Sequence, residues 1–68
     1  MNQIRDYRNR LGLTQKQLSE KTGISLASIS SYERELRRPK IDKLIKISKI
    51  LKTKPTYLTG MKVFNDEA

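Results

Sequence analysis

Small polar side chains and basic side chains lie next to each other in the middle of this chain. Residues 25–31 contain four serines together with Leu26, Ala27 and Ile29, and none of these residues is charged. Serine hydroxyls donate to or accept from base edges, and small side chains let a helix come close to them. These residue types suit contact with base edges rather than bond-breaking chemistry, but by themselves they indicate only an exposed surface.

The basic residues are unevenly distributed. The chain has 68 residues, with 15 Lys and Arg against 7 Asp and Glu, a formal net charge of +8. Residues 34–54 hold nine of these bases and two acids. The densest part, Arg37-Arg38-Pro39-Lys40, is predicted to be a loop because proline breaks a helix. Charge alone leaves two interpretations open, a polyanionic partner or a solvated surface.

The composition argues against several classes of protein. The sequence has no cysteine and no histidine, so the commonest soft metal ligands and the usual general base near neutral pH are missing. We therefore expect no enzyme, no metal and no cofactor. No apolar run approaches the ~18 residues that span a bilayer, and the first residues lack the apolar core of a signal peptide. A small cytoplasmic domain without a membrane partner is the expectation.

Five short helices are predicted to position these residues. The first spans about 2–11, with Asn2 as its N-cap and Gly12 as a left-handed stop. The second starts at Thr14, where Gln17 completes a capping box, and ends before Gly23.

The remaining helices complete an all-α fold. Ser25 caps the third helix, whose predicted buried face is Ile29, Tyr32 and Leu36. The fourth spans about 41–52. Its predicted apolar stripe is Ile41, Leu44, Ile45, Ile47, Ile50 and Leu51. The fifth runs from Pro55 through Leu58 and stops at Gly60.

The spacing within residues 15–33 is typical of a helix-turn-helix. Only Thr22-Gly23-Ile24-Ser25 separates the second and third helices, and Gly23 supplies the positive φ of a sharp turn. Leu18, Ile24 and Ile29 are expected to hold the two helices at a fixed angle. The outer face of the third helix then stays exposed and can enter a major groove. Outside this spacing, a serine-rich face would be read simply as exposed surface.

These motifs resemble the phage repressor and Cro-like helix-turn-helix domains, the xenobiotic-response-element class of bacterial and phage regulators. The matching stretches are Leu11-Gly12-Leu13-Thr14-Gln15, Leu18-Ser19-Glu20-Lys21-Thr22-Gly23-Ile24-Ser25, Ile29-Ser30-Ser31-Tyr32-Glu33-Arg34, Arg38-Pro39 and Thr56-Tyr57-Leu58-Thr59-Gly60. The resemblance covers about residues 3–60 and implies a compact five-helix, lambda-repressor-like domain that binds operator DNA as a two-fold dimer. We expect the domain to span 1–60. The tail, 61–68, is expected to fray or to lie at a dimer interface.

The resemblance also implies roles for individual residues. The expected base-reading residues are Ser25, Leu26, Ala27, Ser30 and Ser31. The expected contacts to the DNA backbone are Gln15, Ser28, Arg37, Arg38, Lys40 and Lys43. An internal ion pair is expected between Arg8 and Glu33, with a phosphate contact from Arg8 as the alternative. The candidates for a dimer contact are Pro55, Tyr57, Leu58 and Met61.

Three departures from the family pattern bear on these expectations. Glu35 stands where the family often has glycine, so the third helix is expected to end later or with a different cap, with Leu36 helping to bury it. Lys40 replaces a common capping residue. Leu26 and Ala27 stand where many relatives carry Gln or Arg, which predicts modest base specificity and a larger share for DNA shape and backbone contacts.

The sequence therefore predicts a DNA-binding transcriptional regulator, most simply a repressor that occupies an inverted-repeat operator as a homodimer. The resemblance implies a bacterial or phage-encoded protein associated with the nucleoid. Two alternatives remain open, an antitoxin-like protein-interaction module and a non-specific nucleic-acid binder. The second normally offers more stacking aromatics than the three tyrosines and one phenylalanine present here.

Overall fold

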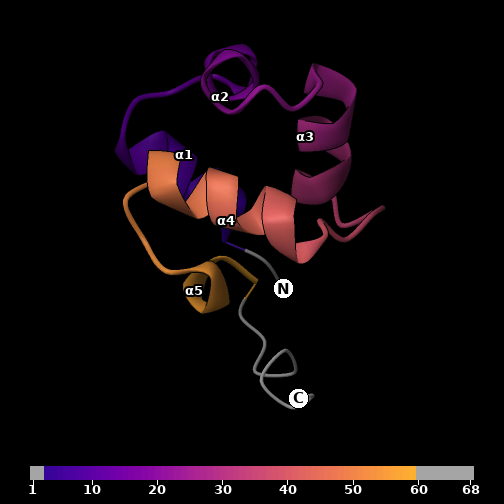
Figure 1. Ribbon diagram of the computed structural model, residues 1–68. Helices are drawn as coiled ribbons and strands as arrows, with labels where there is room; N and C mark the ends of the chain where they lie inside the picture. The colour runs from indigo at the N-terminus through magenta and orange to yellow at the C-terminus, as the bar shows by residue number, and fades with distance from the viewer. Residues whose placement is uncertain (1–2, 60–68) are drawn as a thin grey trace.

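The computed structural model describes residues 3–59, and in this part of the chain five α-helices and no strand are present (Figure 1). The helices are α1 Ile4–Arg10, α2 Gln15–Thr22, α3 Leu26–Glu33, α4 Ile41–Ile50 and α5 Pro55–Thr59. The predicted all-α class is confirmed. Asn2 and Gly60, the expected first cap and last stop, lie outside the described residues, as does Met61.

The helices pack around one hydrophobic core. α2 contacts α3 and α4, α1 contacts α3 and α5, and α4 contacts α5. The buried apolar residues are Ile4, Leu18, Ile24, Ile29, Tyr32, Leu44, Ile47, Leu51 and Leu58. The backbone N–H of Gln3 donates to the carbonyl of Leu58, which ties α5 to the start of α1. In Figure 1, α3 stands at the right-hand edge of the molecule, so that one of its sides faces outward.

The N-terminal caps of α2 and α3 are those predicted. The Thr14 hydroxyl accepts the Gln17 N–H at 3.0 Å, and the Gln17 side chain accepts the Thr14 N–H at 2.8 Å. The Ser25 hydroxyl accepts the Ser28 N–H at 3.1 Å. At the start of α4, Lys40 makes no side-chain cap hydrogen bond, as expected for lysine.

The end of α3 differs from the prediction. The helix ends at Glu33, and Glu35 adopts a left-handed φ of 61°. The N–H groups of Glu35 and Leu36 donate to the carbonyls of Tyr32 and Ser31 at 3.1 and 2.9 Å, which is a Schellman motif with glutamate in the usual glycine position. Leu36 is 63% exposed because the α3 position that normally packs against it is a serine. The prediction that Leu36 is buried was wrong.

The predicted apolar stripe of α4 was too wide. Leu44, Ile47 and Leu51 are buried in the core, but Ile41 and Ile45 are 58% and 40% exposed. The buried three follow a spacing of 3 and 4, whereas Ile41 and Ile45 fall on the flank of the same helix. A helix that packs on one side of a small domain buries a single stripe, and these two isoleucines lie outside it.

Candidate nucleic-acid interface

The turn between α2 and α3 is held by hydrogen bonds from small side chains. Gly23 has φ 76°, and a Cβ there would meet nothing within 4 Å, so the backbone angle is what requires glycine. The Thr22 hydroxyl donates to the carbonyl of Leu18 at 2.8 Å and accepts the N–H of Ile24 at 3.2 Å. The Ser19 hydroxyl donates to the carbonyl of Ile24. These bonds fix the angle at which α3 leaves the turn.

One side of α3 belongs to the core, and the other carries the residues expected to read bases. Ile29, Tyr32 and Glu33 are buried, whereas Leu26 and Ala27 are exposed. We refer to the outward residues as the α3 face: Ser25, Leu26, Ala27, Ser28, Ser30 and Ser31. Ser28, Ser30 and Ser31 are half-buried, and Ser25 is exposed. The structure therefore brings the expected base-reading residues together at one surface.

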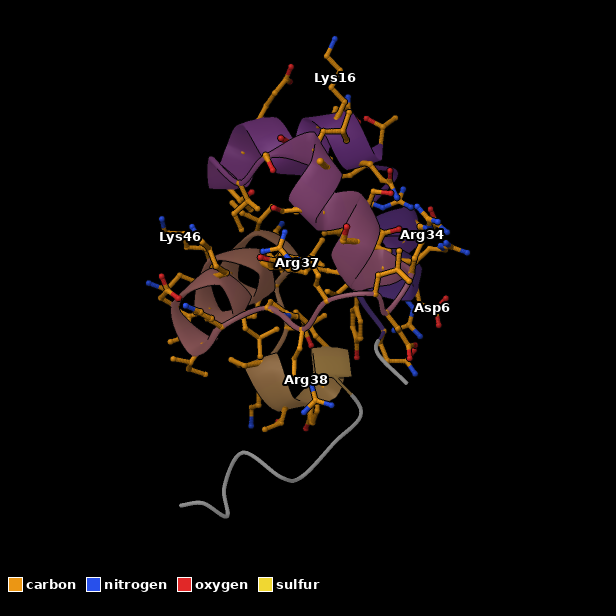
Figure 2. All side chains as sticks on the ribbon, turned by 90° about the vertical axis from the view of Figure 1, so that its right-hand side faces the viewer. Asp6, Lys16, Arg34, Arg37, Arg38 and Lys46 are labelled. Atoms are coloured by element: carbon orange, nitrogen blue, oxygen red, sulfur yellow. The ribbon has the colours of Figure 1, made fainter. Side chains whose placement is uncertain are left out.

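Basic side chains surround α3 on this surface. Figure 2 shows α3 toward the viewer, with Lys16 above it, Arg37 on one side and Arg34 at its C-terminal end. A guanidinium nitrogen of Arg37 donates to the Ser28 hydroxyl at 3.4 Å, and the guanidinium carbon lies 5.9 Å from the centre of the Tyr32 ring. The Arg37 side chain therefore packs against α3.

The other expected backbone contacts are spread more widely. In the view of Figure 2, Arg38 lies toward the lower end of the molecule, away from the first turn of α3. Lys40 is exposed and Lys43 half-buried at the start of α4. The view also shows Lys16 at the top and Lys46 at the left-hand edge of the molecule, two bases that the sequence interpretation did not include among the DNA contacts.

Beneath the α3 face, the Glu33 carboxylate forms the centre of a charged cluster of Arg5, Arg8, Gln15 and Glu33, the Glu33 cluster. Arg8 donates through Nε to Oε2 at 2.6 Å and through Nη2 to Oε1 at 2.9 Å. The Glu33 side chain is 0% exposed, so Arg8 and Glu33 form a buried bidentate ion pair. Arg8 also donates to the carbonyl of Leu13 at 2.8 Å. The pair joins α1, the following loop and α3.

The Glu33 cluster shifts the pKa values of Glu33 and Arg8. Burial raises the pKa of the Glu33 carboxyl, but the hydrogen bonds from Arg8 and Gln15 and the charge of Arg8 outweigh burial, so this pKa lies below its ordinary value. The hydrogen bond to Glu33 raises the pKa of Arg8, against the opposite effect of burial. Both groups are therefore charged over the whole neutral range.

Gln15 and Arg5 complete the cluster. The Gln15 Nε2 donates to Glu33 Oε1 at 3.1 Å, and because an amide nitrogen carries two N–H groups, the second can still meet a phosphate. Arg5 Nε donates to the same oxygen at 3.5 Å, with a side chain that is largely exposed. The sequence interpretation missed Arg5. Its spacing of three from Arg8 places both on one side of α1 and was the available signal.

The residues predicted to form a dimer contact differ in their exposure. Tyr57 is exposed and Pro55 is half-buried on α5. Leu58 is fully buried in the core, so its prediction as a dimer contact was wrong. The reason is that α5 is short and uses Leu58 to close the core against α1 and α4.

Between residues 3 and 59, no helix is long and apolar enough to cross a membrane. The same residues hold no group of three or more His, Cys, Asp and Glu side chains placed to bind a metal ion.

Five helices around one core, with a tight α2–α3 turn that presents the side of α3, define a helix-turn-helix domain of the lambda-repressor type. A family model described as helix-turn-helix matches residues 4–58. The chain belongs to the Cro/C1-type helix-turn-helix family, as the resemblance implied. This family consists of DNA-binding domains of transcriptional regulators.

Similar curated proteins come from Bacillus subtilis (strain 168). The chain is 37% identical over 57 residues to the HTH-type transcriptional regulator ImmR, covering 84% of this chain and 45% of that protein. It is 34% identical over 58 residues to the uncharacterized HTH-type transcriptional regulator YobD, covering 85% and 52%. It is 36% identical over 69 residues to the uncharacterized HTH-type transcriptional regulator YqaE, covering 96% and 60%. The chain thus spans about half the length of these relatives. No solved structure matches it.

Proposed function

We propose that this chain is a sequence-specific DNA-binding domain that represses transcription by occupying an operator. The α3 face enters the major groove, and the flanking bases hold the DNA backbone. The observation that carries this proposal is the uncharged α3 face with basic side chains around it (Figure 2). Small residues allow close approach to base edges, and the positive rim attracts phosphates.

The proposed backbone contacts come from three directions. Gln15 lies at the first residue of α2, Arg37 lies beside Ser28, and Lys40 and Lys43 lie at the start of α4. Arg38 adds a contact farther from the first turn of α3 (Figure 2). Phosphates held from several directions orient the domain, while the base contacts select the sequence.

We further propose that two copies bind an inverted repeat. A two-fold axis near α5, with the exposed Tyr57 and the half-buried Pro55 as contacts, would place the two copies of α3 in successive major grooves about 34 Å apart. The proposed domain covers residues 1–60, and the protein acts in the cytoplasm at the nucleoid without cofactor, metal or catalysis. Three similar proteins are named as transcriptional regulators, which supports the proposed role of this chain in transcriptional regulation.

The test is selection of bound duplexes from a random pool at about 150 mM salt, a concentration that weakens unspecific attraction. We expect an enriched inverted repeat whose half-sites are about one helical turn apart. Leu26→Gln and Ser31→Ala should each change the enriched sequence, whereas Lys49→Gln, on the exposed side of α4, should leave it unchanged. Binding without enrichment, lost as salt rises, would contradict the proposal and indicate a non-specific binder.

A further inference from the structure

We propose that Leu26 recognises the 5-methyl group of a thymine in each operator half-site. This inference rests on the proposed function, because it assumes that the α3 face meets base edges. The proposed function does not say which chemical group on the DNA the first turn of α3 selects, and this inference names that group.

The position and exposure of Leu26 are the first support. It is the first residue of α3, and it is 46% exposed, whereas Ile29 and Tyr32 of the same helix are buried in the core. The neighbouring Ala27 is exposed as well. The first turn of α3 therefore presents apolar carbon at the place where the proposed groove contact is made.

The second support is that the hydroxyls of this turn are already engaged. The Ser25 hydroxyl accepts the Ser28 N–H at 3.1 Å and lies 3.0 Å from the Ser28 hydroxyl. The Ser28 hydroxyl also accepts a hydrogen bond from Arg37 at 3.4 Å. Turning Ser25 toward a base would remove the α3 cap and destabilise the helix. Leu26 and Ala27 can therefore meet a base without disturbing the helix, whereas Ser25 would have to give up its capping hydrogen bond.

The third support is the chemistry of the major groove. Among the four bases, only thymine carries a methyl group on its groove edge, whereas the other edges present donors and acceptors. A leucine against a polar edge would strip water from a donor or acceptor without replacing its hydrogen bond. Leu26 therefore favours thymine and disfavours the other three bases at one position per half-site.

The test removes the methyl group and nothing else. In the duplex enriched by the selection above, each thymine is replaced in turn by deoxyuridine, and the Kd is measured for the wild type, Leu26→Ala and Leu11→Ala. Leu11 is the matched control because it is 41% exposed and lies at the end of α1. Both variants exchange an exposed leucine and should keep the fold, which circular dichroism checks.

One thymine per half-site should respond. Loss of one buried methyl weakens binding about fourfold per half-site, and about sixteenfold when both half-sites are changed. Leu26→Ala should bind the thymine and deoxyuridine duplexes equally, whereas Leu11→Ala should keep the wild-type difference. Replacing that base pair so that 5-methylcytosine stands in the thymine position should bind more tightly than unmethylated cytosine there.

Two results would overturn the inference. A deoxyuridine scan without any responsive position would show that no methyl is read, and a response that persists in Leu26→Ala would assign the contact to another residue. If the wild type enriches no sequence at all, the proposed function itself fails, and this outcome is distinguishable because the scan then has no starting duplex.

Discussion

Glu33 is the residue on which the position of the α3 face depends most. Its carboxylate is fully buried and accepts hydrogen bonds from Arg8, Gln15 and Arg5, which come from α1 and α2. A buried charge is tolerated only when such partners replace its water. The Glu33 cluster therefore couples the orientation of α3 to the two preceding helices.

Arg8→Met should strongly destabilise the fold. It leaves the buried Glu33 carboxylate without its bidentate partner, and the expected loss is about 3–5 kcal/mol in the free energy of unfolding. Urea unfolding at pH 7 measures this loss. Lys49→Met, on the exposed side of α4, is the control and should change stability by no more than about 0.5 kcal/mol.

The double variant Arg8→Met, Glu33→Leu should recover much of the loss, since no unpaired charge remains. A loss below about 1 kcal/mol for Arg8→Met would contradict the buried pair.

Glu33 should also give stability a specific dependence on pH. Its pKa is lower in the folded protein than in the unfolded chain, where it is about 4.3, so its contribution is fully present above that value. The contribution is lost as the pH falls from there through the folded pKa. The difference in unfolding free energy between the wild type and Glu33→Gln should therefore be constant near neutrality and shrink in acid. Urea unfolding from pH 7 down to the acid range tests this, and a difference that stays constant throughout would contradict it.

At the scale of the elements, local patterns predicted the starts of helices better than their buried faces. The caps of Thr14 and Ser25 involve partners three residues away, so the sequence alone reveals them. The exposure of Ile41, Ile45 and Leu36 depends on which flank of an element packs against distant helices, and single-helix periodicity does not contain that information.

The candidate site was predictable to a similar extent. The outward placement of Ala27, Ser30 and Ser31 follows from the helix period, and the Arg8–Glu33 pair was expected only through the family resemblance. Gln15 reaches Glu33 across 18 residues of sequence, and no local pattern indicates that contact. Arg5 lies three residues before Arg8, so its contact with Glu33 could have been inferred once the Arg8–Glu33 pair was expected. The left-handed Glu35 was not predicted, because glutamate rarely adopts this conformation.

Glu35→Gly should stabilise the domain. Glu35 has φ 61°, a conformation that costs a side-chain-bearing residue about 1–2 kcal/mol and glycine almost nothing. We expect a gain of about 1 kcal/mol, which raises Tm by roughly 4–8 °C in a domain of this size. The matched control is Glu20→Gly in the exposed side of α2, where the same exchange should cost about 1 kcal/mol. Equal losses in both variants would show that Glu35 is not strained.

At the scale of the whole molecule, the charge distribution agrees with the proposed orientation on DNA. The side of the molecule that carries α3 also carries Lys16, Arg34 and Arg37 (Figure 2). The compact five-helix fold holds these basic side chains at fixed positions. Their contacts with phosphates therefore orient the domain on the DNA.

Arg37→Ala should weaken binding to all duplexes by a similar factor. The loss of one phosphate contact should reduce the slope of log K against log salt by about 0.9. Measurements between about 50 and 200 mM salt on the selected duplex and on an unrelated one provide the test. Lys49→Ala removes the same charge from the exposed side of α4 and should change the slope less. If both variants change the slope equally, Arg37 contributes only long-range attraction.

In the proposed complex, the α3 face and no other surface meets the base edges. An NMR titration of the labelled protein with the selected duplex at about 150 mM salt tests it most directly. The largest changes in amide signals should occur in residues 25–31 and at Gln15 and Arg37, with little change on the outer side of α4 around Ile45. Large changes around Ile45 with unchanged signals from residues 25–31 would contradict the claim.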